Sequence, residues 1–303
     1  MKFAIFLFIL LAPIQSWAKP LVVSTIRPLT MIIEAIAGDS VDVHQLLSDT
    51  QEPHHYSMRI ADNLALSRAD LVIWIGPELE SFLVRAIANL NPEKVITANA
   101  LPGIQALSQA GANDPHIWLN PQNGIVIATE LSNWLAAHYP STRPSLLAKQ
   151  QLFRSQTLAS CSSISESLAP LADAKILVDH DAFGHFFSFF NIQQAGALKT
   201  TSGLPIGAGS LHELLGDGNF DCIITEPRSQ VDRVDKIAAT LSTHSAQENQ
   251  SPTVMLDPLG ADIADSENAY VDLLNGLAKA LQVCISGNTS QTERSAETAA
   301  AHR

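Results

Sequence analysis

Eight short runs rich in β-branched residues recur along the chain, and segments with helical spacing of apolar residues separate them. Strands that alternate with helices predict parallel sheets with helical crossovers. The fold class is therefore α/β, with two lobes that each hold a roughly four-stranded parallel sheet flanked by helices. The predicted strands cover residues 21–25, 41–46, 71–75, 95–97, 176–178, 192–195, 222–225 and 254–256.

A long helical segment divides these strands into two groups of four. Between Pro144 and Pro170 the chain carries apolar residues at helical spacing without an internal Gly or Pro. A helix of about 25 residues would be nearly 40 Å long, which is enough to join two lobes rigidly. We predict an N-terminal lobe at 19–143, a linking helix at 144–170 and a C-terminal lobe at 171–286. The alternative is an ordinary surface helix within one lobe.

The first 18 residues have the pattern of a secretory signal peptide. Lys2 gives a positive start, an apolar run extends from Phe3 to Ile14, and Ser16-Trp17-Ala18 offers a cleavage site with small residues. The run is too short to span a bilayer comfortably. No cysteine stands at the cleavage point for lipid attachment, so we expect a periplasmic protein without a stable membrane anchor, cleaved near Ala18.

Acidic residues outnumber basic ones. Without Lys2, 17 of the 18 Lys and Arg remain against 30 Asp and Glu, which is a net charge of −13. This charge argues against nucleic acid or an anionic membrane as a partner, although it can equally serve solubility. The tail at 287–303 is rich in Ser, Thr, Ala and Glu, and this composition predicts disorder.

The chain has three cysteines, Cys161, Cys222 and Cys284. In an oxidising compartment this number suggests one disulfide and one remaining thiol. The sequence by itself permits three pairings.

Four polar clusters come where a parallel-sheet protein places its function, in loops near the carboxyl ends of strands. Each cluster contains one candidate metal ligand, and these candidates are His54, His116, His180 and Asp257. The clusters are Glu52–Ser57, Asp114–Pro121, His180–His185 and Asp257–Gly260.

Three imidazoles and one carboxylate form a tetrahedral ligand set that suits Zn²⁺ and tolerates Mn²⁺ or Fe²⁺. The argument rests on loop context, because separations of 62, 64 and 77 residues between positions 54, 116, 180 and 257 match no short zinc motif.

Each of these residues also has a plainer interpretation. A single histidine beside proline and aromatic residues is more often a hydrogen-bonded structural residue, and Asp257 could cap the turn that follows it. His55 and His185 adjoin the clusters, and we assign them outer-shell or surface roles. The fourth ligand stays open between Asp257, His55, Glu226 and water.

The same four clusters resemble the metal-site motifs of the binding proteins of zinc and manganese ABC importers. The matching motifs are Pro53-His54-x-Tyr56-Ser57, Asp114-Pro115-His116-x-Trp118-Leu119, His180-Asp181-Ala182-Phe183-Gly184 and Asp257-Pro258-Leu259-Gly260. Residues 72–78 and 224–227 are similar to the zinc-type branch of that family, and the likeness spans nearly the whole mature chain.

The resemblance implies that His54, His116 and His180 ligate the metal and that Asp257 supplies, or lies near, the fourth ligand. It also implies a disulfide between Cys222 and Cys284. One departure is the short segment 99–113, where many zinc-type members carry a long loop rich in His and acidic residues. This departure leaves a role of that loop in gathering zinc in doubt.

The function that follows is capture of Zn²⁺ in the periplasm and delivery to an inner-membrane ABC permease, by a monomer that catalyses no reaction. One alternative is a manganese or iron importer of the same class. Another is a periplasmic zinc hydrolase with Glu226 as general base, although the chain has no HExxH helix and no G-x-S-x-G turn. A third is an adhesin or metal chaperone.

Overall fold

Two four-stranded parallel sheets form the framework of the molecule. The computed structural model describes residues 19–301 apart from 110–111, 217–219 and 228–251. The N-terminal sheet has the strand order β2-β1-β3-β4, and the C-terminal sheet has the order β10-β9-β7-β8. The strands are β1 (Leu21–Ser24), β2 (Asp42–Gln45), β3 (Leu71–Trp74), β4 (Val95–Thr97), β7 (Ile176–Val178), β8 (Gln194–Ala197), β9 (Cys222–Thr225) and β10 (Thr253–Met255).

Buried β-branched residues explain the central strands. In β3 all four residues, Leu71–Trp74, are buried, as expected for a strand covered on both faces. Val22 pairs with Val43 on one side and with Leu71 on the other, all in parallel register. The α/β class and the division of eight strands into four and four are confirmed.

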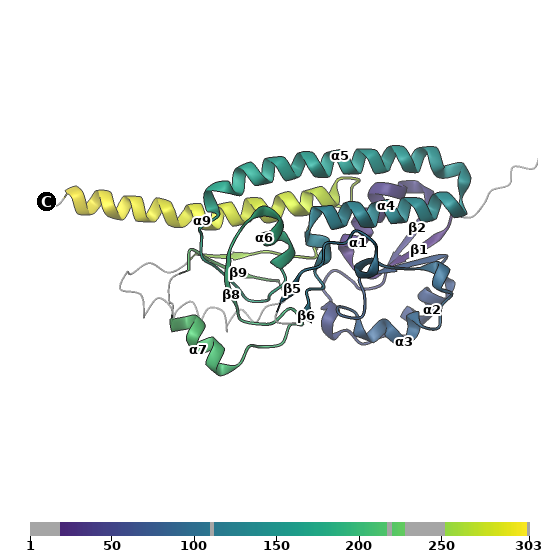
Figure 1. The fold of residues 1–303 in the computed structure, drawn as a ribbon, viewed down its shortest axis with the longest axis horizontal. Helices are drawn as coiled ribbons and strands as arrows, with labels where there is room; N and C mark the ends of the chain where they lie inside the picture. The colour runs from purple at the N-terminus through teal and green to yellow at the C-terminus, as the bar shows by residue number, and fades with distance from the viewer. Residues whose placement is uncertain (1–18, 110–111, 217–219, 228–251, 302–303) are drawn as a thin grey trace, which may run out of the picture.

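Helices cover the sheets and run between them (Figure 1). They are α1 (Arg27–Ala37), α2 (Ile60–Arg68), α3 (Val84–Ile87), α4 (Pro121–His138), α5 (Arg143–Leu168), α6 (Gly184–Phe190), α7 (Ala208–Gly216) and α9 (Ala269–Ala301). The predicted linking helix is α5, which lies along one side of both sheets. A second helix, α9, packs on α1 and α5 and also on β9 and β10, so two helices bridge the lobes.

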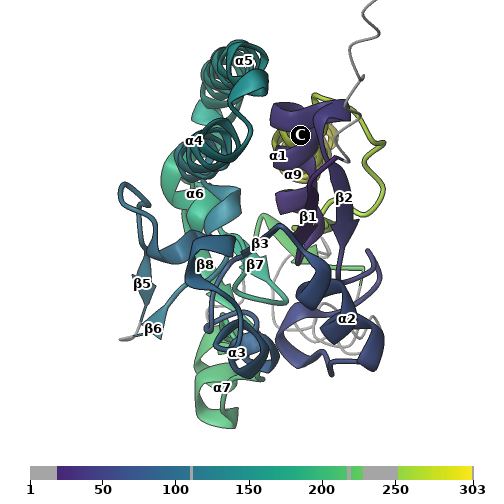
Figure 2. The same cartoon turned by 90° about the vertical axis from the view of Figure 1, so that its right-hand side faces the viewer.

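One apolar core runs through both halves of the chain. Fully buried side chains from α1, α4, α5, β7 and α9 belong to the same cluster, represented by Ile32, Leu131, Leu168, Ile176 and Leu274. Figure 2 shows α4 and α5 on one side and α1 and α9 on the other. A shared core resists independent movement of the lobes, because separating them would expose apolar surface.

Several elements differ from the sequence prediction. Strand β8 begins two residues later than predicted and β10 one residue earlier. A small antiparallel pair, β5 (Ser108–Gln109) and β6 (Ala112–Asn113), was not predicted. Helix α9 continues to Ala301, where composition predicted disorder; the segment contains repeated Ala, the strongest helix former.

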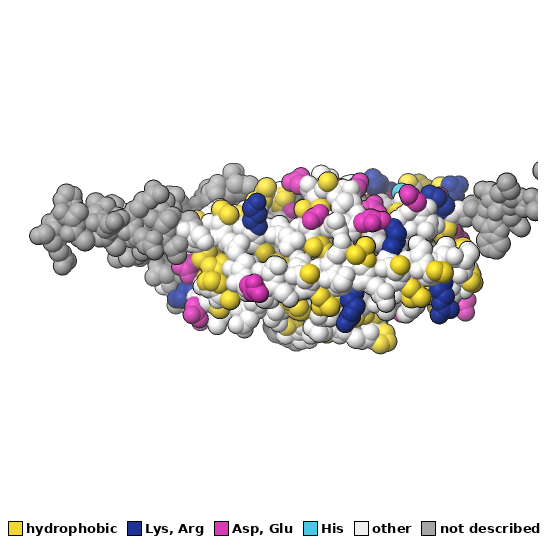
Figure 3. All heavy atoms as spheres, turned by 90° about the horizontal axis from the view of Figure 1, so that it is seen from above, with side chains coloured by type: hydrophobic (Ala, Val, Ile, Leu, Met, Phe, Trp, Pro, Cys, Tyr) yellow, Lys and Arg dark blue, Asp and Glu magenta, His cyan; other side chains and the backbone are white. Residues whose placement is uncertain are grey.

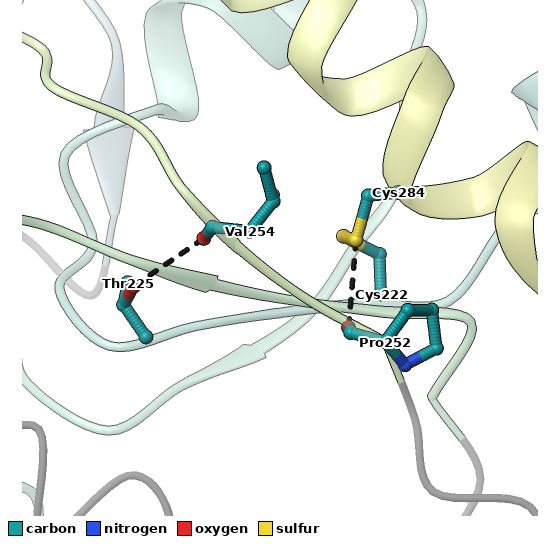
Figure 4. Close-up of a disulfide and its surroundings, with 5 residues drawn as sticks. All are labelled: Cys222, Thr225, Pro252, Val254 and Cys284. Atoms are coloured by element: carbon teal, nitrogen blue, oxygen red, sulfur yellow. Dashed lines mark hydrogen bonds between the residues drawn. A yellow bond between two sulfur atoms is a disulfide. The ribbon is translucent and has the colours of Figure 1, made fainter.

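The disulfide implied by the resemblance is present. Cys222 at the start of β9 is bonded to Cys284 of α9, with a Cα–Cα distance of 5.8 Å, and Cys161 is a free, buried thiol. Figure 4 shows this bond beside Pro252, whose carbonyl oxygen lies 3.4 Å from the sulfur of Cys284. In the described part of the chain, no helix combines the length and apolar character needed to cross a bilayer.

Candidate metal centre

Three histidines from separate loops meet where strands of both sheets end. His54 lies in a 3₁₀ turn, Pro53–His55, after β2, and His116 directly precedes another, Ile117–Leu119. His180 is the second residue after β7. Each offers one ring nitrogen, and the three nitrogens lie within 4.8 Å of one another. No other set of three metal-binding side chains comes this close among the residues that the structure describes.

Local hydrogen bonds fix the turns that carry the first two histidines. Glu52 caps its turn by accepting the backbone N–H of His54 at 3.0 Å, and Asp114 accepts the backbone N–H of His116 at 3.0 Å. Pro53 begins its turn at a position where its fixed φ suits helical geometry. A carboxylate therefore holds the backbone N–H of each of these two histidines, as a cap of the first turn and just before the second.

Two carboxylates orient the imidazole rings. Asp114 Oδ1 lies 2.7 Å from Nδ1 of His116, and Glu226 Oε1 lies 2.9 Å from Nδ1 of His180. With Nδ1 engaged, Nε2 is the nitrogen that each ring can offer to a metal, which is the usual arrangement of ligand histidines. On His180 this Nε2 lies 3.3 Å from the carbonyl oxygen of Thr201. The Nε2 atoms of His54 and His116 are 3.4 Å apart, a distance that two nitrogens bound to one ion readily adopt.

Burial keeps two of the imidazoles neutral. It lowers the pKa of His54 to about 3, assisted by the neighbouring His116. The pKa of His116 also lies well below its ordinary value, because of burial and then of His180 and His185. Burial acts in the same direction on His180, but the hydrogen bond and charge of Glu226 outweigh it and raise the pKa of His180. Of the three imidazoles, that of His180 is therefore the one on which a proton competes most with a metal.

The space enclosed by the three rings suits a single ion. A cavity of about 10 Å³ is lined by the three histidines together with Glu52, Glu226, Pro258 and Leu259, among others. That is about the room for one water-sized sphere. Beside it lies a polar cavity of about 200 Å³ bordered by Glu52, His55 and Lys199. A larger cavity, of about 800 Å³, lies between β2 and α2 and is bordered by none of the three histidines.

Asp257 lies next to this cavity but outside the group of three nitrogens. Its Oδ1 accepts the backbone N–H of Leu259 at 3.0 Å, and its Oδ2 accepts that of Ala261 at 2.7 Å. These bonds make it a cap of its own turn, the plainer interpretation that the sequence allowed.

The other candidates have distinct places. His55 is exposed and lies within reach of Gly203, whereas His185 is buried with Nε2 3.1 Å from the carbonyl oxygen of Asp114. His185 therefore lies behind the ligand loop. Glu226 contacts Nδ1 of His180 through Oε1 and also lines the cavity between the three rings.

Sequence reasoning missed two roles. Glu52 and Asp114 were recognised only as members of their clusters, yet both hold a histidine-bearing turn and Asp114 also orients a ring. A carboxylate two residues before each histidine, with proline between, was the signal that could have revealed them.

Comparison with known proteins finds related sequences and structures. The model of a protein family described as zinc-uptake complex component A, periplasmic, matches residues 22–284. The high-affinity zinc uptake system protein ZnuA of Yersinia pestis is 27% identical over 309 residues, covering 91% of this chain and 95% of that protein. The Haemophilus ducreyi protein of the same name is 25% identical, covering 87% and 93%.

Solved structures share the fold. A ZnuA deletion mutant with zinc bound matches with a TM-score of 0.74 at 25% identity, covering 88% of this chain and 98% of that one. The periplasmic zinc-binding protein TroA of Treponema pallidum matches with a TM-score of 0.79 at 21% identity, covering 88% and 99%.

Proposed function

Because the chain belongs to the periplasmic zinc-uptake complex component A family, we propose that it captures Zn²⁺ through His54, His116 and His180 and delivers the ion to an inner-membrane ABC permease. The observation that carries the ligand assignment is the convergence of these three ring nitrogens within 4.8 Å. Two of the rings are already oriented by carboxylates, so the protein pays little reorganisation on binding.

This donor set favours Zn²⁺ over Mn²⁺. Three imidazole nitrogens are borderline-soft ligands that favour Zn²⁺, whereas Mn²⁺ prefers more oxygen donors. Asp257 remains our proposed fourth ligand, and it would have to turn away from the backbone N–H groups that it now accepts. Its contribution to affinity should therefore be smaller than that of a histidine.

We propose that the protein binds and carries the ion without catalysing a reaction, since its family consists of transport components. The hydrolase alternative needs Glu226 as a free general base. Instead, Glu226 is engaged with Nδ1 of His180. This contact supports a binding role.

The proposal includes location and organisation. The mature protein would begin near Lys19 in the periplasm after removal of residues 1–18, which lie outside the described residues. It would act as a monomer without a membrane anchor. The lobes would be 19–143 and 171–286, joined by 144–170, with the ion held between them.

The test uses the purified mature protein after removal of metal by a chelator. Competition titrations at matched ionic strength should give tighter binding of Zn²⁺ than of Mn²⁺. Replacing His54, His116 or His180 by Ala should weaken Zn²⁺ binding by more than about 100-fold, because each removes a direct ligand.

His185→Ala should have little effect on affinity, and His44→Ala, on the exposed part of β2, is a matched surface control. Tighter binding of Mn²⁺ would overturn the choice of zinc. Equal losses in all the variants would overturn the ligand assignment.

A further inference from the structure

The segment between β10 and α9 passes from one lobe to the other within a single residue. The backbone N–H of Leu256 donates to Thr225 O at 2.8 Å, which keeps Leu256 on the C-terminal sheet. The carbonyl oxygen of Pro258 accepts the indole N–H of Trp118 at 2.8 Å. Asp257 is therefore the one residue between an attachment to the C-terminal lobe and an attachment to the N-terminal lobe.

Arg27, the first residue of α1, makes most of the second attachment. Its Nε donates to the carbonyl oxygen of Gly260 at 3.1 Å, and its Nη2 donates to that of Ile263 and to Asp265 Oδ1, the latter at 2.7 Å. Hydrogen bonds from a charged donor are stronger than neutral ones, and the planar guanidinium holds several acceptors in fixed directions.

The burial of Arg27 strengthens these hydrogen bonds. Its side chain is only 11% exposed, so water competes poorly for its N–H groups. Its Nη1 is 4.0 Å from Asp49 Oδ2, in the loop that leads from β2 to His54. Arg27 thus lies between the loop before His54 and the segment 258–265.

Gly260 provides a second, independent contact at the same place. Its φ of +69° is a conformation that other residues adopt at a cost. A Cβ at this position would lie 3.0 Å from Met31 Cε and 3.1 Å from Leu273 Cδ1, so a larger residue would require these side chains of α1 and α9 to shift. The backbone is thereby held close against α1, with its carbonyl oxygen presented to Arg27.

We propose that Arg27 is a positioning residue for metal retention, which fastens the cavity wall formed by Pro258 and Leu259 to the N-terminal lobe. Those two residues line the cavity of the three histidines. The half of the site that contains His54, His116 and this wall then forms one unit. His180 and Glu226, which follow strands β7 and β9 of the C-terminal sheet, form the other, and the chain joins the two units at Asp257. This inference rests on the proposed function for its ligand.

Two measurements on Arg27→Gln test the proposal. In the mature protein loaded with Zn²⁺, release into excess chelator should be faster by about tenfold, while the association rate stays within about twofold, because the lost contact acts on retention. In the metal-free protein, amide hydrogen exchange should be faster by about tenfold in residues 258–265 and unchanged in β1.

Three further variants sharpen the result. Arg27→Lys keeps the charge but not the several directed N–H groups, so it should behave like Arg27→Gln rather than like the wild type. Gly260→Ala should reproduce both effects without altering Arg27, which keeps the test open if the arginine variants fold poorly. Asp265→Asn is the control, since that carboxylate is 73% exposed and its removal leaves both backbone acceptors in place.

Wild-type release rates in Arg27→Gln and Gly260→Ala would overturn the role in retention. Unchanged exchange in residues 258–265 would overturn the attachment itself. The exchange measurement needs no metal, so a failure of the wild-type protein to bind Zn²⁺ would refute the proposed function and leave this test intact.

Discussion

Each of the two most buried histidines of the candidate centre is paired with a carboxylate, but the two pairs differ in electrostatics. Asp114 is buried, which raises its pKa to about 6, and one of its oxygens has no hydrogen-bond partner. Glu226 raises the pKa of His180, whereas His116 stays neutral. Competition between a proton and the metal is therefore concentrated on His180.

Glu226→Gln should change the pH dependence of Zn²⁺ affinity. Because the pKa of His180 is raised, protons compete with the metal up to a higher pH, and affinity should rise with pH until His180 is neutral. The neutral Gln removes that charge, so the rise should end at a lower pH. The plateau affinity should fall by about tenfold, since the ligand loses its anionic partner.

Isothermal titration calorimetry in buffers of different ionisation enthalpy would count the protons released on binding. The variant should release fewer protons near neutral pH than the wild type. An unchanged proton count and an unshifted pH profile would show that Glu226 does not control His180.

Asp257→Asn tests the fourth ligand. We expect about tenfold weaker Zn²⁺ binding, a smaller loss than for a histidine, because Asp257 exchanges two backbone hydrogen bonds for the metal. Competition with a chelator gives the affinity. Glu52→Gln is the matched comparison, since Glu52 already lines the cavity. A larger loss in Glu52→Gln than in Asp257→Asn would transfer the fourth position to Glu52.

The rule that functional loops follow the ends of parallel strands holds for His54 and His180, which follow β2 and β7, but not for His116, which follows the antiparallel β6. The sequence could therefore predict part of this cluster from strand order. It could not predict the partners of those rings. Glu226 follows β9, 46 residues after His180, and only the parallel pairing of β7 with β9 brings them together. The sequence also could not predict that both carboxylate oxygens of Asp257 accept backbone N–H groups of its own turn, which compete with binding of a metal.

At the scale of elements, the disulfide fastens the start of β9 to α9 across 62 residues. Figure 4 also shows the hydroxyl of Thr225 donating to the carbonyl of Val254 at 3.4 Å, a side-chain link between β9 and β10. Strand β9 is therefore joined covalently to α9 at its first residue and paired with β10 along its length.

Replacing both Cys222 and Cys284 by Ala should lower the free energy of unfolding by about 4 kcal/mol, as expected for a closed loop of this length. The melting temperature should fall by roughly 10 °C. Zn²⁺ affinity should stay nearly constant, because Cys222 lies about 13 Å along β9 from Glu226. Thermal denaturation with and without Zn²⁺ measures both quantities.

The free thiol of Cys161 is present in both the wild type and the double variant, so any difference between them comes from loss of the disulfide. Unchanged stability of the double variant, or a large loss of affinity at constant stability, would contradict this account.

Elements with a strong periodic signal were predicted well. The buried strand β3 and the helix α5 follow directly from β-branched runs and helical spacing. The β5–β6 pair was missed because two strands of two residues carry no measurable periodicity. Strand β8, with the sequence Gln194-Ala-Gly-Ala197, has no β-branched residue, so the predicted strand was drawn to the preceding Ile192.

At the scale of the molecule, two long helices and a continuous core join the lobes. Helix α5 packs on α1 and α4, and α9 contacts both α1 and the C-terminal sheet. The helical face seen in Figure 3 intersperses acidic and basic side chains, without a large field of one sign. Domain closure of the kind that needs a few flexible hinge strands has no counterpart in these connections.

Zn²⁺ binding should therefore change the overall dimensions very little. Small-angle X-ray scattering of the mature protein, with and without Zn²⁺, should give radii of gyration that differ by less than about 1 Å, because bending the lobes apart would disrupt the core that they share. The thermal transition should nevertheless rise with Zn²⁺ concentration, because the ion binds only the folded site. His116→Ala should abolish the rise and leave the scattering of the metal-free protein unchanged. A decrease of several ångströms on binding would mean that the lobes close around the ion as independent bodies, and that α5 and α9 bend to allow it.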